Sequence, residues 1–160
     1  MSRRLRVAIA GAGSLLLLAG ALAFQYIGGL APCPTCIWQR WPHGAAILFA
    51  LVAIGFKTPP RILVLGGALS AAVTAGIGIY HAGVEQRWWQ GPSSCSGFDP
   101  SQMTPDELFQ HLATAPLVRC DEIPWEFVGL SMAAWNAVLS AILVLIWISA
   151  LWIGRGAARH

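Results

Sequence analysis

The chain has few charged residues for its length. Only 11% of its 160 residues are charged, whereas soluble globular domains carry about 25%. So few charges do not cover the surface of a soluble globule of this size, and 56% of the residues are hydrophobic. No acidic residue precedes Glu85, and no internal repeat or low-complexity segment is present. These absences exclude an ordinary soluble domain and favour a lipid bilayer as the solvent.

Four apolar segments are long enough to cross a bilayer as helices, which takes about 20 apolar residues. They cover residues 7–30, 36–56, 62–84 and 132–153. A helix satisfies its own backbone hydrogen bonds, so each segment is compatible with lipid. The sequence therefore predicts an all-α membrane protein that forms one integral membrane domain over residues 1–160. We expect a four-transmembrane-helix bundle with a short loop at about 31–35 and a long loop between helices 3 and 4, at about 85–131.

The first apolar segment also resembles a secretory signal. Arginines precede it, and Ala21-Leu22-Ala23 is similar to a cleavage site. The apolar core of a signal is usually about 7–15 residues, which is shorter than this run. We therefore expect the segment to remain as a helix. Cleavage after Ala23 would leave the orientation of the later segments unchanged.

Basic residues are concentrated at one end of the predicted bundle. Seven of the ten lie at the termini and in the connection between the second and third segments: Arg3, Arg4, Arg6, Lys57, Arg61, Arg155 and Arg159. Loops rich in Lys and Arg stay in the cytoplasm, so both termini are predicted to be cytoplasmic. All seven acidic residues lie in the long connection on the opposite side. The net charge of +3 thus reflects topology and indicates no nucleic-acid partner.

The four cysteines form two pairs, and both pairs lie in connections that the charge pattern places outside the cytoplasm. Cys33 and Cys36 lie beside the first outer connection, and Cys95 and Cys120 lie in the second. Disulfides persist in oxidising compartments such as the bacterial periplasm. Oxidising chemistry fits this distribution.

The segment Cys33-Pro34-Thr35-Cys36 is the strongest local signal. Two cysteines at this spacing can close a disulfide or share one thiolate charge. We expect Thr35 to be the N-cap of the second helix, which would place Cys36 in the first turn. There the positive end of the helix dipole stabilises a thiolate.

Two other interpretations of the cysteines stay open from the residues alone. A zinc site commonly uses two close pairs of ligands, whereas Cys95 and Cys120 are far apart in the sequence. A purely structural disulfide between Cys95 and Cys120 is the more serious alternative. Either would make the protein a non-enzymatic membrane scaffold with structural disulfides or a metal site.

Arg40 follows Cys36 by four residues, so the two share a helix face. An arginine at a membrane interface often serves only as an anchor. Beside a reactive thiolate, a guanidinium also suits the carbonyl of a quinone and the negative charge that forms as the ring is reduced. His43 continues the same face as a weaker candidate. Pro42 removes one helical hydrogen bond, which makes this shared face approximate.

Two segments resemble the DsbB (disulfide bond formation protein B) family. Residues 33–40, Cys-Pro-Thr-Cys-Ile-Trp-Gln-Arg, are similar to its Cys-x-x-Cys-x-x-x-Arg segment. Residues 120–132, Cys-Asp-Glu-Ile-Pro-Trp-Glu-Phe-Val-Gly-Leu-Ser-Met, are similar to its segment leading into the last span. The four-span layout and the order of the cysteine pairs match too. In quinone–thiol enzymes of the vitamin K epoxide reductase type the loop cysteines come first, so the order seen here disfavours that family.

The resemblance implies a quinone-dependent protein dithiol oxidase of the bacterial inner (cytoplasmic) membrane. Such an enzyme reoxidises a periplasmic DsbA-like thioredoxin-fold oxidase and passes the electrons to the membrane quinone pool, ubiquinone or menaquinone. It thereby supports protein disulfide bond formation. The redox cysteines would lie on the periplasmic side of the lipid bilayer.

The resemblance also implies roles for individual residues. The implied catalytic residues are Cys33, Cys36, Cys95 and Cys120. Cys36 would be the thiolate partner of the quinone ring, Cys95 would form the mixed disulfide with the soluble partner, and Cys120 would resolve it. Arg40 resembles the quinone-site arginine, and His81 lies about where the family has a histidine near the quinone, with a loose local match. No metal is expected.

Overall fold

The computed structural model describes residues 1–93, 95, 104–114 and 118–152. In chain order, the elements are α1 (Arg3–Tyr26), α2 (Pro34–Ile54), α3 (Arg61–Glu85), α4 (Pro105–Thr114), β1 (Glu126–Phe127), β2 (Leu130–Ser131) and α5 (Met132–Trp152). Three residues used in the sequence predictions, Ile153, Arg155 and Arg159, lie outside the described residues, as do residues 94, 96–103 and 115–117 of the long connection.

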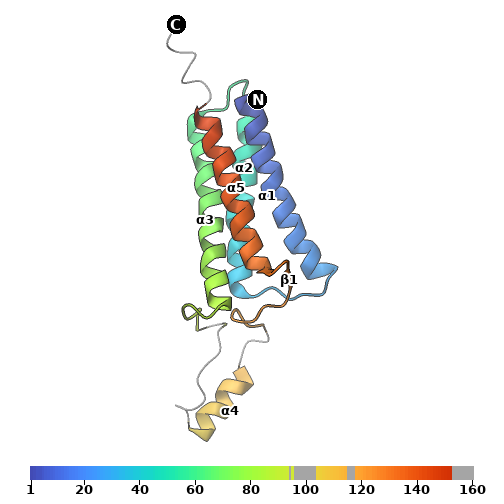
Figure 1. Cartoon of the computed structure of the whole chain (residues 1–160), viewed down its shortest axis with the longest axis vertical. Helices are drawn as coiled ribbons and strands as arrows, with labels where there is room; N and C mark the ends of the chain where they lie inside the picture. Colours follow the sequence, from blue (N-terminus) through green and yellow to red (C-terminus); the bar gives the residue numbers. More distant parts are fainter. Residues whose placement is uncertain (94, 96–103, 115–117, 153–160) are drawn as a thin grey trace.

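The four long helices, α1, α2, α3 and α5, run side by side as one bundle (Figure 1). Helix α3 packs against α2 and α5, and α1 packs against the same two helices on its own side. Small residues permit close approach, because a Cβ at Gly78 would lie 3.0 Å from the backbone nitrogen of Ala137, and one at Gly11 would overlap Cβ of Ala50. Such contacts between small residues are typical of helix pairs in membranes.

The two halves of the bundle differ in chemistry. Near the chain's N-terminus the core is apolar, with Val7, Val64 and Trp147 completely buried. Most of the buried polar side chains lie in the other half, where α2 begins and α3 ends, and they include Thr35, Gln39, His43, His81 and Glu85. The half of the bundle in which α2 begins and α3 ends is therefore the candidate location of the functional site.

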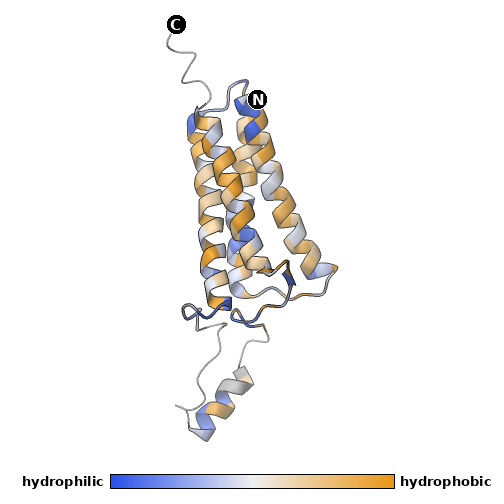
Figure 2. Cartoon of the chain, viewed as in Figure 1, coloured by the Kyte–Doolittle hydropathy of each residue, from blue (hydrophilic) through white to orange (hydrophobic). Residues whose placement is uncertain are grey.

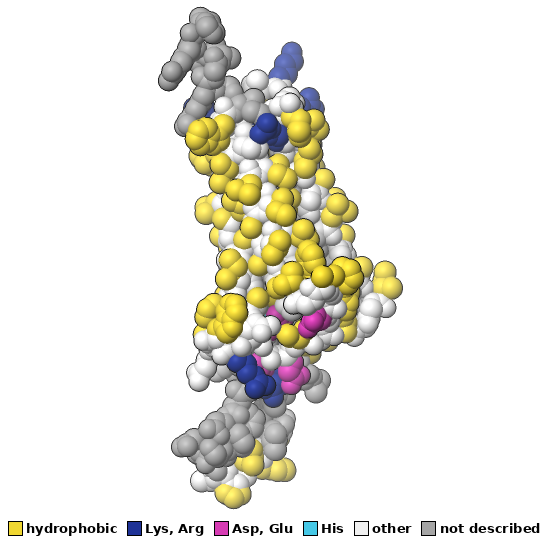
Figure 3. All heavy atoms as spheres, in the orientation of Figure 1, with side chains coloured by type: hydrophobic (Ala, Val, Ile, Leu, Met, Phe, Trp, Pro, Cys, Tyr) yellow, Lys and Arg dark blue, Asp and Glu magenta, His cyan; other side chains and the backbone are white. Residues whose placement is uncertain are grey.

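Among the residues that the structure describes, three helices are long and apolar enough to cross a membrane. These are α1, α3 and α5, with mean hydropathies of 2.2, 2.1 and 2.1. The predicted second span, α2, is not among them, because its first half contains Gln39, Arg40 and His43. Large apolar side chains nevertheless lie exposed on all four long helices; Leu16, Leu48, Leu69 and Leu145 are examples. Figure 3 shows hydrophobic side chains over the face of the bundle in view, and the ribbons of the long helices in Figure 2 are coloured mostly as hydrophobic.

The start of α2 corrects one prediction. Its N-cap is Cys33 and not Thr35, and the helix begins at Pro34. Proline is favoured at this first position, because the helix requires no N–H donor there and the ring already has a helical φ. Cys36 still falls in the first turn. At the start of α1, Ser2 caps the helix by accepting a hydrogen bond from the backbone of Leu5, so this helix begins before the apolar run itself.

A short helix and a two-stranded hairpin lie in the long connection. Helix α4 begins with a reciprocal capping arrangement, in which the Glu107 N–H donates to Oγ1 of Thr104 and the Thr104 N–H donates to the Glu107 carboxylate. The antiparallel strands β1 and β2 pair Phe127 with Leu130. Gly129 has a positive φ of 73° in the turn between them. Ser131, the last residue of the hairpin, directly precedes α5.

Candidate functional site

The Cys-x-x-Cys segment forms the first turn of α2. As the N-cap, Cys33 accepts a hydrogen bond at its Sγ from the backbone N–H of Cys36, at 3.2 Å. The two sulfur atoms are 2.9 Å apart and not covalently joined, so both cysteines are free thiols in this structure. The helix start thus directs a backbone donor at Cys33, which is where an N-terminal helix dipole stabilises negative charge.

Cys33 is surrounded by groups that stabilise a thiolate. The hydrogen bond with the Cys36 thiol, opposed by burial and reinforced by His81, lowers the pKa of Cys33 to about 4. His81 contributes because its Nε2 lies 3.6 Å from Cys33 Sγ. The sequence and the family resemblance directed attention to Cys36 as the thiolate. The structure directs the Cys36 backbone N–H and the His81 ring at Cys33, so both groups favour a thiolate at that sulfur.

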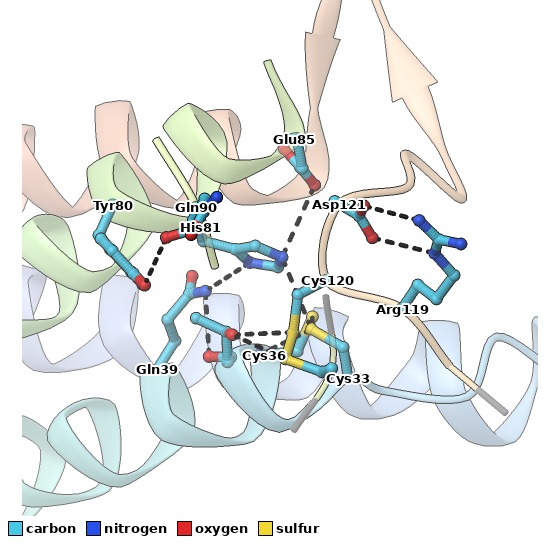
Figure 4. The surroundings of a disulfide bond; sticks show 12 residues. Cys33, Cys36, Gln39, Tyr80, His81, Glu85, Gln90, Arg119, Cys120 and Asp121 are labelled. Atoms are coloured by element: carbon cyan, nitrogen blue, oxygen red, sulfur yellow. Dashed lines mark hydrogen bonds and ion pairs between the residues drawn. A yellow bond between two sulfur atoms is a disulfide. The ribbon is translucent and has the colours of Figure 1, made fainter. Parts of the chain in front are cut away.

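The second cysteine pair lies against the first. Cys95 and Cys120 form a disulfide, and both side chains are completely buried. Together with Cys33 and Val84 they make one cluster, and Cys36 packs at its edge. Two connections that are remote in the sequence thus bring all four cysteines together, as Figure 4 shows for three of them.

Thr35 fills the space between the two pairs. Its side chain is completely buried, and Oγ1 lies 3.0 Å from Cys120 Sγ and 3.9 Å from Cys95 Sγ. The sequence indicated only a capping role for this residue. The structure instead makes it a contact between the Cys-x-x-Cys segment and the disulfide.

His81 comes from the last turn of α3 and is held on both ring nitrogens. Its Nδ1 lies 3.1 Å from Nε2 of Gln39, and its Nε2 faces both Cys33 and, at 3.9 Å, the carboxylate of Glu85. The amide nitrogen of Asn136 donates in turn to the Gln39 oxygen at 2.7 Å. Gln39 therefore presents its NH₂ group to Nδ1, which leaves the ring proton on Nε2, directed at Cys33.

Glu85 is a functional candidate that sequence reasoning missed. It lies at the end of α3, 8% exposed, and accepts a hydrogen bond from the hydroxyl of Ser131. In the sequence it counted only as one of the acidic residues of the outer side. The available signal was the four-residue spacing from His81, which places both side chains on one face of a helix.

A largely apolar cavity of about 410 Å³ opens beside the thiol pair. Its lining includes Phe24, Cys33, Cys36, Arg40, His81 and Trp125. The three residues predicted to bind a quinone, Cys36, Arg40 and His81, thus all line one cavity. The disulfide partners Cys95 and Cys120 are not in its lining.

The cavity wall combines an apolar lining with an arginine that has an unpartnered donor among the described residues. Arg40 donates from Nη1 to Oε1 of Gln25 at 2.6 Å, and its Nε is buried without a partner among the described residues. A buried donor without a partner is costly, and the carbonyl of a quinone is an acceptor that would satisfy an arginine at this wall. An apolar lining with few polar groups is typical of sites for small organic molecules.

His43 also lines the cavity and is 3% exposed. Its Nε2 is 2.9 Å from Oδ1 of Asn136, the residue that holds Gln39. His43 is therefore part of the polar network that crosses from α2 to α5.

Three potential metal ligands also meet at this site. The ligand atoms of Cys33, Cys36 and His81 lie within 4.8 Å of one another. A structural zinc site usually has four ligands, and this group offers three among the described residues. Such a group would be available to a metal only while both cysteines are reduced.

Comparison with known proteins gives a consistent result. A family model described as disulfide bond formation protein DsbB matches residues 3–150. A disulfide bond formation protein B of Xanthomonas oryzae pv. oryzae is 37% identical over 153 residues, which cover 90% of this chain and 87% of that protein. Disulfide bond formation protein B 2 of Pseudomonas aeruginosa is 31% identical, with 91% and 89% covered. The Shewanella amazonensis disulfide bond formation protein B is 32% identical, with 91% and 88% covered.

Proposed function

The chain belongs to the DsbB family of disulfide bond formation proteins, and from that premise we propose that it is a protein-thiol:quinone oxidoreductase. It reoxidises a DsbA-like thioredoxin-fold oxidase of the periplasm and passes two electrons to ubiquinone or menaquinone. The observation that carries this proposal is the meeting of all four cysteines beside an apolar cavity whose wall contains Arg40. The adjacency of the two pairs supports electron transfer between them by thiol–disulfide exchange.

The electron path begins at the partner. A thiolate of the reduced partner attacks Cys95 and forms a mixed disulfide, and Cys120 leaves as a thiolate. The second partner thiol then attacks the mixed disulfide, which releases the oxidised partner and leaves Cys95 reduced. Cys120 next attacks Cys33 of an oxidised Cys33–Cys36 pair, and Cys36 leaves with the electron pair. Cys95 then attacks the Cys120 sulfur of the Cys33–Cys120 bond, and Cys33 leaves as a thiolate. The Cys95–Cys120 disulfide is restored, and the Cys33–Cys36 pair holds both electrons.

The reduced thiol pair lies where it can pass its electrons to a quinone. A bound quinone supplies an acceptor for two electrons and two protons. The reduced pair holds both electrons, and with Cys33 as the thiolate the proton of the pair is on Cys36. Cys36 lines the cavity, Arg40 would hold a carbonyl and stabilise negative charge on it, and His81 holds a proton beside Cys33. The apolar lining keeps water away from the reacting groups.

The first exchange requires movement of the long connection. Cys95 is completely buried in this structure, although its polar, turn-prone surroundings in the sequence suggest an accessible site. A protein thiolate cannot reach a buried sulfur, so the segment bearing Cys95 must lift away from α2 before the partner attacks. The docked arrangement described here serves the second exchange, between Cys120 and Cys33.

A trapping experiment tests the order of exchange. With Cys120→Ala and a partner that lacks its own resolving cysteine, the partner thiol is first activated as a mixed disulfide with a small thiol. The Cys95 thiolate should displace the small thiol, and the bond to the partner should accumulate because neither protein keeps the thiol that would resolve it. Mass spectrometry of the trapped peptide identifies the cysteine. A bond mapped to Cys33 instead would show that the order is wrong.

We further propose four membrane spans, with both termini in the cytoplasm and the cysteines in the periplasm. The polar first half of α2 is compatible with this, because Gln39 and His43 are buried and hydrogen-bonded inside the bundle. Buried polar residues in membrane helices face the bundle interior in this way. Topology reporters fused at Lys57 and at Gln90 should give opposite signals. The same signal from both would contradict the four-span arrangement.

The alternative is a scaffold in which Cys33, Cys36 and His81 hold a metal ion, and their proximity is the observation that favours it. Titration of free thiols in the purified, metal-free protein separates the two functions. An oxidoreductase in which Cys33 and Cys36 are reduced and Cys95–Cys120 is a disulfide loses two thiols when short-chain quinone is added. A scaffold keeps its thiol count and binds a stoichiometric metal ion.

A further inference from the structure

The Thr35 hydroxyl has an unusual set of neighbours for a threonine at the start of a helix. The side chain is completely buried, and the described contacts of Oγ1 are with two sulfur atoms: Cys120 at 3.0 Å and Cys95 at 3.9 Å. A buried hydroxyl normally bonds to a backbone carbonyl or another polar group. Here the sequence separation of 85 residues between Thr35 and Cys120 shows that the contact depends on docking of the long connection.

The same docking aligns the two redox pairs. Thr35 lies between Cys33 and Cys36 in the first turn of α2, while Cys120 belongs to the buried cluster that contains Cys33. The backbone N–H of Cys120 donates a hydrogen bond to the carbonyl oxygen of Cys95 at 2.6 Å, so this N–H does not donate to the Cys120 sulfur. Thr35 is therefore the nearby hydroxyl donor for any charge that develops on that sulfur.

We propose that Thr35 is a positioning residue for Cys120 in the exchange between the two cysteine pairs. This proposal rests on the function proposed above. When the Cys95–Cys120 pair is reduced and docked, the Thr35 hydroxyl donates a hydrogen bond to the Cys120 thiolate and holds it beside Cys33. The Cys120 sulfur then forms a bond to Cys33, the Cys33–Cys36 bond breaks, and Cys36 leaves with the electron pair. The threonine loses no proton in this step and is unchanged at its end.

The hydroxyl should act on this inner exchange and not on the attack by the partner. Partner attack needs Cys95 exposed, whereas the contact with Thr35 exists only while the long connection is docked on α2, where position 95 is buried. Hydrogen bonds to charged groups contribute more than neutral ones, and loss of one corresponds to a change of roughly tenfold or more in an equilibrium or rate. Cys120 should thus lose about that factor in thiolate fraction when the hydroxyl is removed.

An equilibrium experiment tests this without quinone or partner. In full-length protein carrying Cys33→Ala, Cys36→Ala and Cys95→Ala, the thiolate absorbance of Cys120 is followed against pH in detergent. Thr35→Val, which has nearly the same shape, should move the titration to higher pH and lower the thiolate fraction at a fixed pH about tenfold. Thr35→Ser, which keeps the hydroxyl, should restore it. The matched control is Thr58→Val, at an exposed threonine between α2 and α3.

A kinetic experiment on the four-cysteine protein completes the test. Oxidised protein is mixed with a reduced partner, quenched with acid, and its disulfides are mapped over time. Thr35→Val should slow formation of the Cys33–Cys120 bond about tenfold and leave the mixed disulfide at Cys95 forming at the parent rate. An unshifted Cys120 titration, a serine variant that fails to restore it, or equal slowing of both exchanges would overturn the role of Thr35. Failure of the proposed function would show differently, as absence of any exchange in the parent protein.

Discussion

Replacement of Arg40 by lysine separates quinone binding from membrane anchoring. Arg40 uses Nη1 to bond Gln25 on α1, while its Nε lies buried at the cavity wall without a partner among the described residues. Lysine keeps the positive charge but offers a single ammonium group instead of a planar fork. Its three N–H donors radiate from one nitrogen, so they do not reproduce the separate positions of Nη1 and Nε in the guanidinium. If Arg40 only anchored the helix, Arg40→Lys would behave as the parent.

The size of the effect follows from one lost hydrogen bond. A hydrogen bond involving a charged group contributes about 1.5–3 kcal/mol, and each 1.4 kcal/mol corresponds to about a factor of ten in affinity. We therefore expect Arg40→Lys to raise the quinone concentration for half-maximal turnover by about 10- to 100-fold. The assay is the fall in quinone absorbance with a reduced partner as donor. Turnover at saturating quinone separates weaker binding from weaker stabilisation of the reduced ring.

The matched control is Arg61→Lys, which makes the same change at the far end of α3, away from the cavity. It should leave the quinone dependence unchanged. Thiol exchange at Cys95 should stay at the parent rate in both variants, since that step precedes quinone reduction. If neither Arg40→Lys nor Arg40→Ala alters the quinone dependence, Arg40 is only an anchor and the reasoning is refuted.

Four other predictions concern the thiol pair and the bundle. In reduced protein the thiolate absorbance of Cys33 should persist as pH falls and disappear only near pH 4, because its pKa is lowered to about 4. Cys36→Ala should move this midpoint to higher pH, since the hydrogen bond with Cys36 is the largest cause of the shift; an unmoved midpoint would contradict the assignment. His81→Phe should move the midpoint in the same direction by less. Gly11→Ala should destabilise the bundle in detergent by about 1–3 kcal/mol, because the added methyl overlaps Ala50, whereas Gly20→Ala, with nothing within 4 Å of its Cβ position, should not.

Local features of the site were predictable from the sequence. A helix start in the Cys-x-x-Cys segment with Cys36 in its first turn was predicted, and the structure has this arrangement, although the N-cap is Cys33 and not the predicted Thr35. The four-residue spacing also placed Arg40 on the face that lines the cavity with Cys36. These features depend on residues within two turns of one helix, where side-chain directions follow from helical geometry.

The meeting of the two cysteine pairs was not predictable in the same way. It depends on how the long connection folds back on α2, and no local pattern specifies a contact such as that between Thr35 and Cys120. The polar network failed to stand out for a related reason. Gln39 and Glu85 are ordinary residues for a helix end at an interface. Only the packing of α2 against α3 brings Gln39 to His81, whereas Glu85 faces His81 because the two are four residues apart on α3.

The most direct test of the central claim, that the four cysteines form one path to a quinone, is quinone reduction by the purified protein in detergent. A reduced thioredoxin-fold oxidase is the donor, and short-chain ubiquinone and menaquinone are offered in turn. We expect one quinone to be reduced for each partner disulfide formed, and loss of this turnover in each of Cys33→Ala, Cys36→Ala, Cys95→Ala and Cys120→Ala. Sustained turnover in any of these variants, or no quinone reduction by parent protein that exchanges thiols with the partner, would contradict the account.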